Sequence, residues 1–103
     1  MLEHRSQHTI SGRHPCLAGH FPGNPVVPAV VLLECVSRAL GDALGRPVRL
    51  TALPTVKFLK PLRPEQEFSI EMQIEPDHSA ARFRLTAQGI ELAQGRLEYA
   101  HDA

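Results

Sequence analysis

The chain has 103 residues, of which 43% are apolar and 21% are charged, and its formal net charge is zero. This length and composition predict one soluble domain, residues 1–103, with a core of modest size. The neutral charge provides no basic field that would indicate a nucleic acid or a membrane surface as the partner.

Targeting and metal signals are absent from the sequence pattern. Met1–Arg5 lacks the apolar segment of a signal peptide, and no apolar run approaches the roughly 18 residues of a membrane span. Cys16 and Cys35 fit reduced thiols in a cytoplasmic protein. Several of the six histidines precede residue 21, but glycines and prolines interrupt this stretch and Glu3 is its only acidic residue. We therefore expect no metal site.

The first predicted elements are a strand over residues 3–11 and a loop rich in glycine and proline over residues 12–27. A helix follows, because Pro28 suits a first helical turn, where its missing N–H costs nothing. Gly45, followed by Arg46-Pro47, is a typical helix stop. The helix is therefore expected to begin near Ala29 and to end near Leu44.

The predicted helix is apolar around most of its circumference, so we expect it to be covered on most sides. The main apolar stripe contains Ala29, Leu33, Val36, Leu40, Ala43 and Leu44, and the residues Leu32, Cys35 and Ala39 widen it. The remaining polar stripe carries Glu34, Ser37, Arg38 and Gly41.

Strands are predicted over residues 48–60, with Pro54 as an interruption, and over residues 67–75, 81–87 and 90–99. Pairing the second and third of these across Pro76–Ser79 sets apolar against apolar side chains. The predicted pairs are Ile70 with Leu85, Met72 with Phe83, and Glu71 with Arg84 on the outer face. One antiparallel sheet with one apolar face, wrapped around a central helix, is an α+β architecture.

The segment Gly19–Glu34, GHFPGNPVVPAVVLLE, joins a loop histidine to a helix carboxylate. Three prolines between His20 and Glu34 exclude a shared helix, so only the fold can bring the two side chains together. A loop base and a helix acid are what proton transfer needs. Glu34 is about 9 Å along the helix axis from Pro28. We expect it to be buried there, where a desolvated carboxyl group has a raised pKa and can act as an acid.

This segment resembles the signature of the FabZ and FabA type 3-hydroxyacyl-acyl-carrier-protein dehydratases, HFPGxPxxPGxxxxE, with D at the last position in the FabA branch. The later VKFLKPLRPEQEF is also similar to a strand and proline turn of that family. The resemblance implies the hotdog fold and the dehydration of a 3-hydroxyacyl thioester to a trans-2-enoyl thioester, in fatty acid or related acyl-chain synthesis. It implies no cofactor, and Glu34 favours the FabZ-like branch.

The resemblance also implies roles for particular residues. His20 would take the C2 proton, and Glu34 of the partner subunit would protonate or position the departing C3 hydroxyl across a homodimer interface. Larger assemblies of such dimers are also implied, and the acyl group would be carried on acyl carrier protein. Substrate contacts fall on Phe21, Gly23, Pro28, Ala29 and Val30. The N–H groups at the start of the helix would receive the thioester carbonyl.

Two positions depart from the family pattern. This chain has Ala29 where the family has glycine, and it has Arg38 where FabZ-type members usually have glutamine. Arg38 could pair with Glu34 at i,i+4 and tune it by favouring the ionised carboxylate. Alternatively, this pair is an exposed ion pair without chemistry and His20 is an ordinary loop histidine.

Two other functions stay open. One is a hotdog thioesterase in which Glu34 activates water, although such enzymes usually lack the HFPG loop. The other is a non-catalytic acyl-binding module. The cations Lys57, Lys60, Arg63, Arg82 and Arg84 suit either docking of an acidic carrier or a solvated sheet face.

Overall fold

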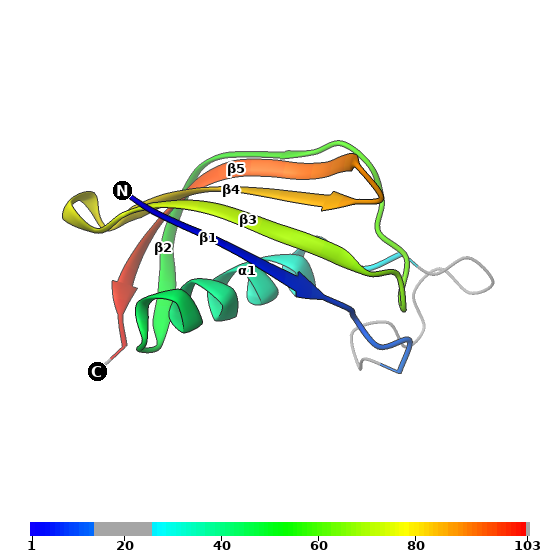
Figure 1. Ribbon diagram of the computed structural model, residues 1–103, viewed down its shortest axis with the longest axis horizontal. Helices are drawn as coiled ribbons and strands as arrows, with labels where there is room; N and C mark the ends of the chain where they lie inside the picture. The colour runs from blue at the N-terminus through cyan, green and yellow to red at the C-terminus, as the bar shows by residue number, and fades with distance from the viewer. Residues whose placement is uncertain (14–25, 103) are drawn as a thin grey trace.

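The computed structural model describes residues 1–13 and 26–102, in which one α-helix lies against an antiparallel sheet (Figure 1). The elements follow the predicted order. They are β1 (Leu2–His8), α1 (Ala29–Leu44), β2 (Val48–Phe58), β3 (Phe68–Glu75), the 3₁₀ turn η2 (Pro76–His78), β4 (Ala80–Ala87) and β5 (Ile90–His101).

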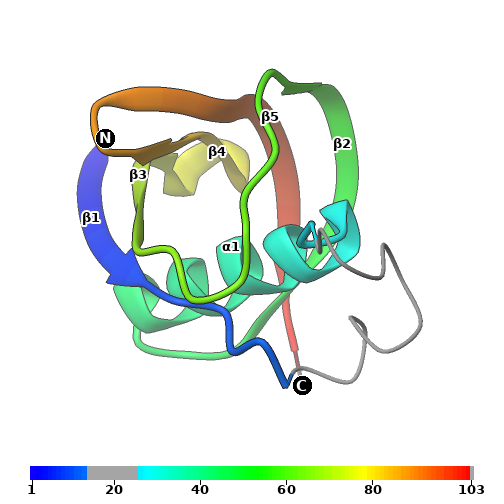
Figure 2. The same cartoon turned by 90° about the vertical axis from the view of Figure 1, so that its right-hand side faces the viewer.

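The five described strands form one sheet in the order β1-β3-β4-β5-β2, so that β1 and β2 are its two edges. Figure 2 shows the sheet curling around α1, with the helix on its concave side. This arrangement confirms the α+β prediction of a sheet wrapped around one helix. It covers the helix from one side only, because no second layer of the described chain lies below α1 (Figure 2).

The register between β3 and β4 is the predicted one, with Met72 opposite Phe83 and Glu71 opposite Arg84. The connecting turn ends at Ser79, which has a φ of 48°, in the left-handed region. The tight turn predicted between β4 and β5 is also present, at Gln88 and Gly89, with φ values of 52° and 78°. Alternation of apolar and polar residues was sufficient to fix this meander.

The edges of the sheet are less regular than the predicted strands. β1 ends at His8 instead of residue 11, β2 ends at Phe58, and β5 extends to His101. The pairing of β2 with β5 shifts register on both sides of Ala52, close to Pro54, which cannot donate to the ladder. A further shift after Leu85 buries both Leu92 and Ala93 of β5.

The buried face of α1 differs from the predicted stripe. Its buried residues are Val31, Leu32, Val36, Ala39 and Leu40. The exposed residues lie along one side of the helix, and they are Ala29, Val30 (56% exposed), Glu34, Arg38 and Asp42. The expectation of a helix covered on most sides therefore holds except along this exposed side. The sheet covers one side of α1, and apolar residues remain on the other.

Both ends of α1 are defined by backbone geometry. Pro28 immediately precedes the first helical residue, with φ of −63° and ψ of 149°. At the other end Gly45 has a φ of 77°, and its N–H donates a hydrogen bond of 2.9 Å to the carbonyl oxygen of Gly41. The predicted stop at Gly45 is confirmed. At 16 residues, this α-helix, the only one in the described residues, does not reach the length of apolar helix that a membrane crossing needs.

Candidate active site

The predicted site residues divide into two groups. His20, Phe21 and Gly23 lie outside the described residues, so the predicted approach of His20 to Glu34 is untested. The remaining site residues belong to α1 or precede it directly, and they are Pro28, Ala29, Val30, Glu34 and Arg38.

The first turn of α1 has two unused hydrogen-bond donors. The carbonyl oxygen of Pro28 accepts hydrogen bonds from the N–H groups of Val31 and Leu32, at 3.0 and 3.3 Å. Within the described chain, the N–H groups of Ala29 and Val30 have no acceptor, and no side chain caps the helix. No acidic residue stands in the first turn. The positive end of the helix dipole is therefore available to a negatively charged oxygen.

The start of α1 is anchored to the connection between β2 and β3. The Val27 N–H donates a hydrogen bond of 2.8 Å to the carbonyl oxygen of Leu62, and both side chains are buried. Sequence reasoning identified the Pro61–Pro64 turn but missed this contact. The sequence did hold a clue to this contact. Val27 and Leu62 are apolar residues within two proline-rich segments, and such residues need a buried partner.

Glu34 lies one turn after Val30 on the same side of α1, and both residues are exposed. The expectation of a carboxylate buried within the single chain is therefore wrong. Glu34 is exposed because it lies on the side of the helix opposite the buried residues Leu32 and Val36. Arg38, also exposed, makes no ion pair with Glu34 within the described residues.

A hollow of about 710 Å³ adjoins Glu34, between the polar stripe of α1 and the beginning of β2. The Ser37 hydroxyl spans the two elements by donating a hydrogen bond of 3.4 Å to the carbonyl oxygen of Val48. The lining residues are Glu34, Ser37, Arg38, Gly41, Asp42, Gly45, Arg46, Pro47 and Val48. The carboxylate thus faces a polar groove that reaches the β2 edge.

The β2 edge carries exposed apolar side chains. In the described sheet β2 pairs with β5 on one side only. Leu53 is 38% exposed on β2, Phe58 is 47% exposed at its end, and Leu59 just beyond it is 48% exposed. An unpaired strand with apolar side chains is a template for pairing with another chain.

Among the described residues, Cys35 is a further candidate reactive group, on the same helix as Glu34. Burial raises the pKa of the Cys35 thiol, with Arg38 opposing this effect, so the thiol stays protonated and a poor nucleophile. Among the described residues, no three histidine, cysteine or acidic side chains are grouped so that they could hold a metal ion.

The curled antiparallel sheet around one helix defines a hotdog-fold protein, and solved structures share this architecture. A dehydratase heterocomplex ApeI:P from Xenorhabdus doucetiae matches with a TM-score of 0.83 at 21% identity, covering 95% of this chain and 87% of that one. A variant of the fluoroacetyl-CoA-specific thioesterase FlK matches with a TM-score of 0.74 at 16% identity, covering 98% and 85%. At these identities the matches show the fold alone.

The chain belongs to the ApeI-like dehydratase family, whose model, described as ApeI dehydratase, matches residues 3–96. Curated relatives include the 3-hydroxyacyl-acyl-carrier-protein dehydratase FabZ of Thermomicrobium roseum, 30% identical over 88% of this chain and 68% of that protein. FabZ of Syntrophobacter fumaroxidans is 31% identical over 63% of this chain and 50% of that protein. The chain spans about half the length of several such relatives. The resemblance to FabZ-like dehydratases is confirmed.

Proposed function

We propose that this chain catalyses the dehydration of a 3-hydroxyacyl thioester to a trans-2-enoyl thioester. The observation that carries the proposal is the arrangement on the exposed side of α1. There the free N–H groups of Ala29 and Val30 stand one turn before the carboxylate of Glu34. The N–H groups can donate hydrogen bonds to an oxyanion, and the Glu34 carboxyl group can donate a proton. Val30 and Glu34 are about 6 Å apart along the helix axis, which is about one turn.

The proposed reaction assigns one task to each group. His20 takes the C2 proton of the substrate, and negative charge develops on the thioester oxygen. The N–H groups of Ala29 and Val30 stabilise this oxygen, which a helix N-terminus does well. Glu34 gives its proton to the C3 hydroxyl, which leaves as water while the C2–C3 double bond forms. Phe21, Gly23 and Pro28 are proposed to line the substrate path.

The proposal requires a second subunit over the exposed side of α1. A partner that pairs along β2 would cover Phe58 and Leu59 and close the groove beside Glu34. Removed from water in this way, a carboxyl group holds its proton more tightly and is better suited to act as an acid. The same contact would bring His20 of one copy to Glu34 of the other, with two equivalent sites in the dimer.

We also propose that the acyl group is carried on acyl carrier protein and that the enzyme works in the cytoplasm without a cofactor. The carrier is supported by the names of the curated relatives. Some structural neighbours are thioesterases, but they share only the fold with this chain, at low sequence identity. They therefore do not favour thioester hydrolysis over dehydration as the activity of this chain.

The direct test incubates the full chain with 3-hydroxyacyl carrier-protein substrates and follows enoyl product and free thiol separately. Enoyl formation that is lost in His20→Ala and in Glu34→Gln supports the proposal. Thiol release without enoyl product would instead assign a thioesterase. Absence of both products across several chain lengths would assign an acyl-binding module.

Mixing the two inactive variants tests the shared site. If His20 and Glu34 come from different subunits, a mixed dimer regains one intact site. Equimolar His20→Ala and Glu34→Gln should then recover about a quarter of wild-type activity after subunit exchange. A site built within one subunit gives no recovery. Mass measurement of the mixture confirms that exchange has occurred.

A further inference from the structure

The outer face of the sheet, opposite α1, has two adjacent rows of polar side chains that cross all five described strands. In strand order, the first row is Glu3, Gln73, Arg82, Arg96 and Thr55, and the second is Arg5, Glu71, Arg84, Gln94 and Lys57. These ten residues line one hollow of about 740 Å³, which we call the outer-face hollow. A hollow of this size falls in the range of small-molecule sites.

Charge is unevenly distributed in the outer-face hollow. Its acids, Glu3 and Glu71, stand on β1 and β3, at one end. The other end, formed by β4, β5 and β2, has cations, neutral hydrogen-bonding groups and the apolar residues Phe83 and Gly95, but no acid. The cations there are Arg82, Arg84, Arg96 and Lys57. Since the chain has zero net charge, this concentration is local and does not reflect a generally basic protein.

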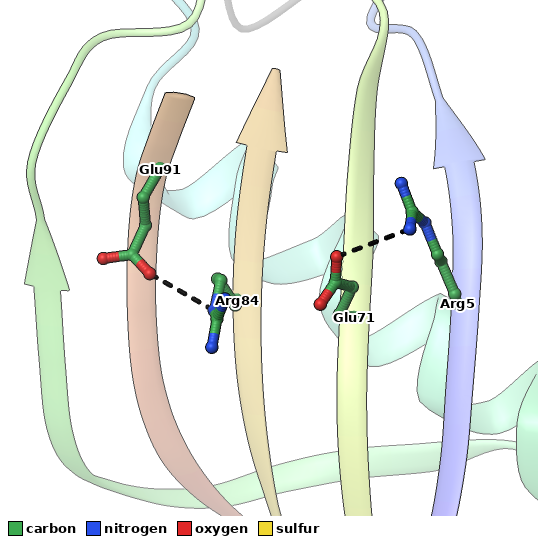
Figure 3. Close-up of polar contacts among 4 residues, drawn as sticks. All are labelled: Arg5, Glu71, Arg84 and Glu91. Atoms are coloured by element: carbon green, nitrogen blue, oxygen red, sulfur yellow. Dashed lines mark ion pairs between the residues drawn. The ribbon is translucent and has the colours of Figure 1, made fainter. Parts of the chain in front are cut away.

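Ion pairs neutralise only part of this cationic end. Figure 3 shows Arg5 paired with Glu71 at 3.7 Å and Arg84 paired with Glu91 at 3.2 Å. Arg96 pairs with Glu75 at 3.0 Å. Within the described residues, Arg82 and Lys57 form no ion pair. Two cations of the hollow are therefore left without a carboxylate.

The position of Arg82 opposes ordinary sheet pairing. Its direct neighbour on β5 is Arg96, and its neighbour on β3 is Gln73. Like charges placed directly opposite one another destabilise a sheet, whereas Glu71 beside Arg84 follows the usual rule. The arginine at residue 82 thus weakens the pairing of the sheet, and it lies in a hollow lined by hydrogen-bond donors. A residue that opposes the fold in such a place indicates a binding role.

We propose that the cationic end of the outer-face hollow binds a small diphosphate-bearing anion. Guanidinium groups donate two parallel hydrogen bonds to phosphate oxygens, and Gln94, Thr55 and Lys57 add further donors on the same face. Bound oxygen atoms would give Arg82 the acidic partner that it lacks within the described residues, whereas Arg96 already pairs with Glu75. The site lies across the sheet from α1, so it is independent of the proposed dehydration.

Calorimetry with inorganic pyrophosphate at low ionic strength tests the proposal on the full chain. Arg82→Gln should weaken binding about tenfold or more, because a charge-assisted hydrogen bond is lost. The matched control is Arg63→Gln, an exposed cation on the β2–β3 connection, which should bind as the wild type does. Absence of saturable binding, or an equal loss in both variants, would overturn the proposal.

Comparing pyrophosphate with ADP shows whether the site recognises the diphosphate group alone or a nucleotide that carries it. Equal affinity for pyrophosphate and ADP indicates that the diphosphate group alone is recognised, and tighter binding of ADP indicates a nucleotide ligand. Sulfate at matched ionic strength should not compete. If it competes as well as pyrophosphate, the hollow attracts an adventitious ion only and the proposal fails.

Stability measurements separate this binding role from a structural one. Without anion, Arg82→Gln should unfold at the same temperature as the wild type or higher, because it removes the like-charge contact with Arg96. Pyrophosphate should raise the unfolding temperature of the wild type more than that of the variant. A variant that is less stable without anion would show that Arg82 supports the sheet itself, contrary to the proposal.

Discussion

The aromatic ring of Phe83 on β4 lies directly against Gly95 on β5. The two residues are opposite each other in the register, and a Cβ atom added at residue 95 would lie 2.8 Å from Cζ of Phe83. The same atom would overlap the carbonyl oxygen of Thr55 on β2. Glycine at residue 95 thus leaves room for both the Phe83 ring and the close approach of the β2 backbone, next to the irregularity at Pro54.

Gly95→Ala should lower the free energy of unfolding by about 2–3 kcal/mol, because the added methyl group has no space between ring and carbonyl. Urea denaturation measures the loss. Gln94→Ala, at the neighbouring exposed position, should change stability by less than about 0.5 kcal/mol. Equal effects of the two substitutions would show that the close approach does not limit packing.

Phe58→Glu should convert the proposed dimer into a folded monomer. Phe58 is 47% exposed at the end of β2, and a charge there cannot be buried against a second copy without a partner. The dissociation constant should rise about a hundredfold or more, and dehydratase activity should fall with it. Analytical ultracentrifugation follows the change of mass.

The control is Leu2→Glu, because Leu2 is 49% exposed on the opposite edge of the sheet. This variant should keep the mass and activity of the wild type. A dimer that survives Phe58→Glu and dissociates in Leu2→Glu would place the contact at β1 instead.

Arg38→Gln tests the tuning role that the sequence predicted for Arg38. Within the described chain the guanidinium forms no ion pair with the Glu34 carboxylate, and both side chains are exposed. The substitution should therefore change the rate of dehydration by less than about twofold, because an exposed charge of this kind contributes little. Rate measurements on Arg38→Gln and on Arg46→Gln, in the same hollow, should agree. A large loss of rate in Arg38→Gln alone would support the tuning role instead.

His8 should make the protein less stable as the pH falls. Burial lowers the pKa of His8 below its usual value of 6.5, which Asp42 opposes and His4 reinforces. The ring stacks near Phe68 at 5.6 Å and bonds to the Ser6 hydroxyl. Because the unfolded chain binds this proton more readily, the free energy of unfolding should decline as the pH drops through 6.5 and level off below the folded pKa.

Urea denaturation of the wild type and of His8→Gln, between about pH 7.5 and 5, measures this contribution. The variant should lose that part of the pH dependence, and the exposed His78→Gln should retain it. Parallel curves for the wild type and His8→Gln would disprove the role of His8.

The regular part of the fold follows from local rules. The alternation in β3 and β4 predicts the observed register, and Gly45 predicts the end of α1. The interruption predicted at Pro54 is confirmed by the register shift between Ala52 and Thr55. The shift after Leu85 was not predictable, because it depends on which strands become neighbours. The orientation of α1 was predicted in part. The apolar residues Leu32, Val36, Ala39 and Leu40 are buried and the polar stripe is exposed at Glu34 and Arg38, as expected, but the apolar Ala29 and Val30 are exposed as well.

The candidate site was only partly predictable. The motif located Glu34 and the helix start, and the structure adds the free donors at Ala29 and Val30. The exposure of Glu34 was not anticipated, since periodicity cannot separate a side that faces water from one that awaits another subunit. The anchoring of Val27 by Leu62 joins residues 35 positions apart, and no local pattern reports such a contact.

The bare start of α1 has a consequence for how the protein responds to heat. A helix without a side-chain cap frays from that end, at a lower free energy than the rest of the fold needs to open. Among the described residues, the opposing restraint is the hydrogen bond from the Val27 N–H to the Leu62 carbonyl oxygen, with the burial of those two side chains. The donors proposed to receive substrate belong to the same turn. On heating, we therefore expect this one helical turn to loosen while the sheet around it is still intact, and the proposed activity to be lost before the protein unfolds.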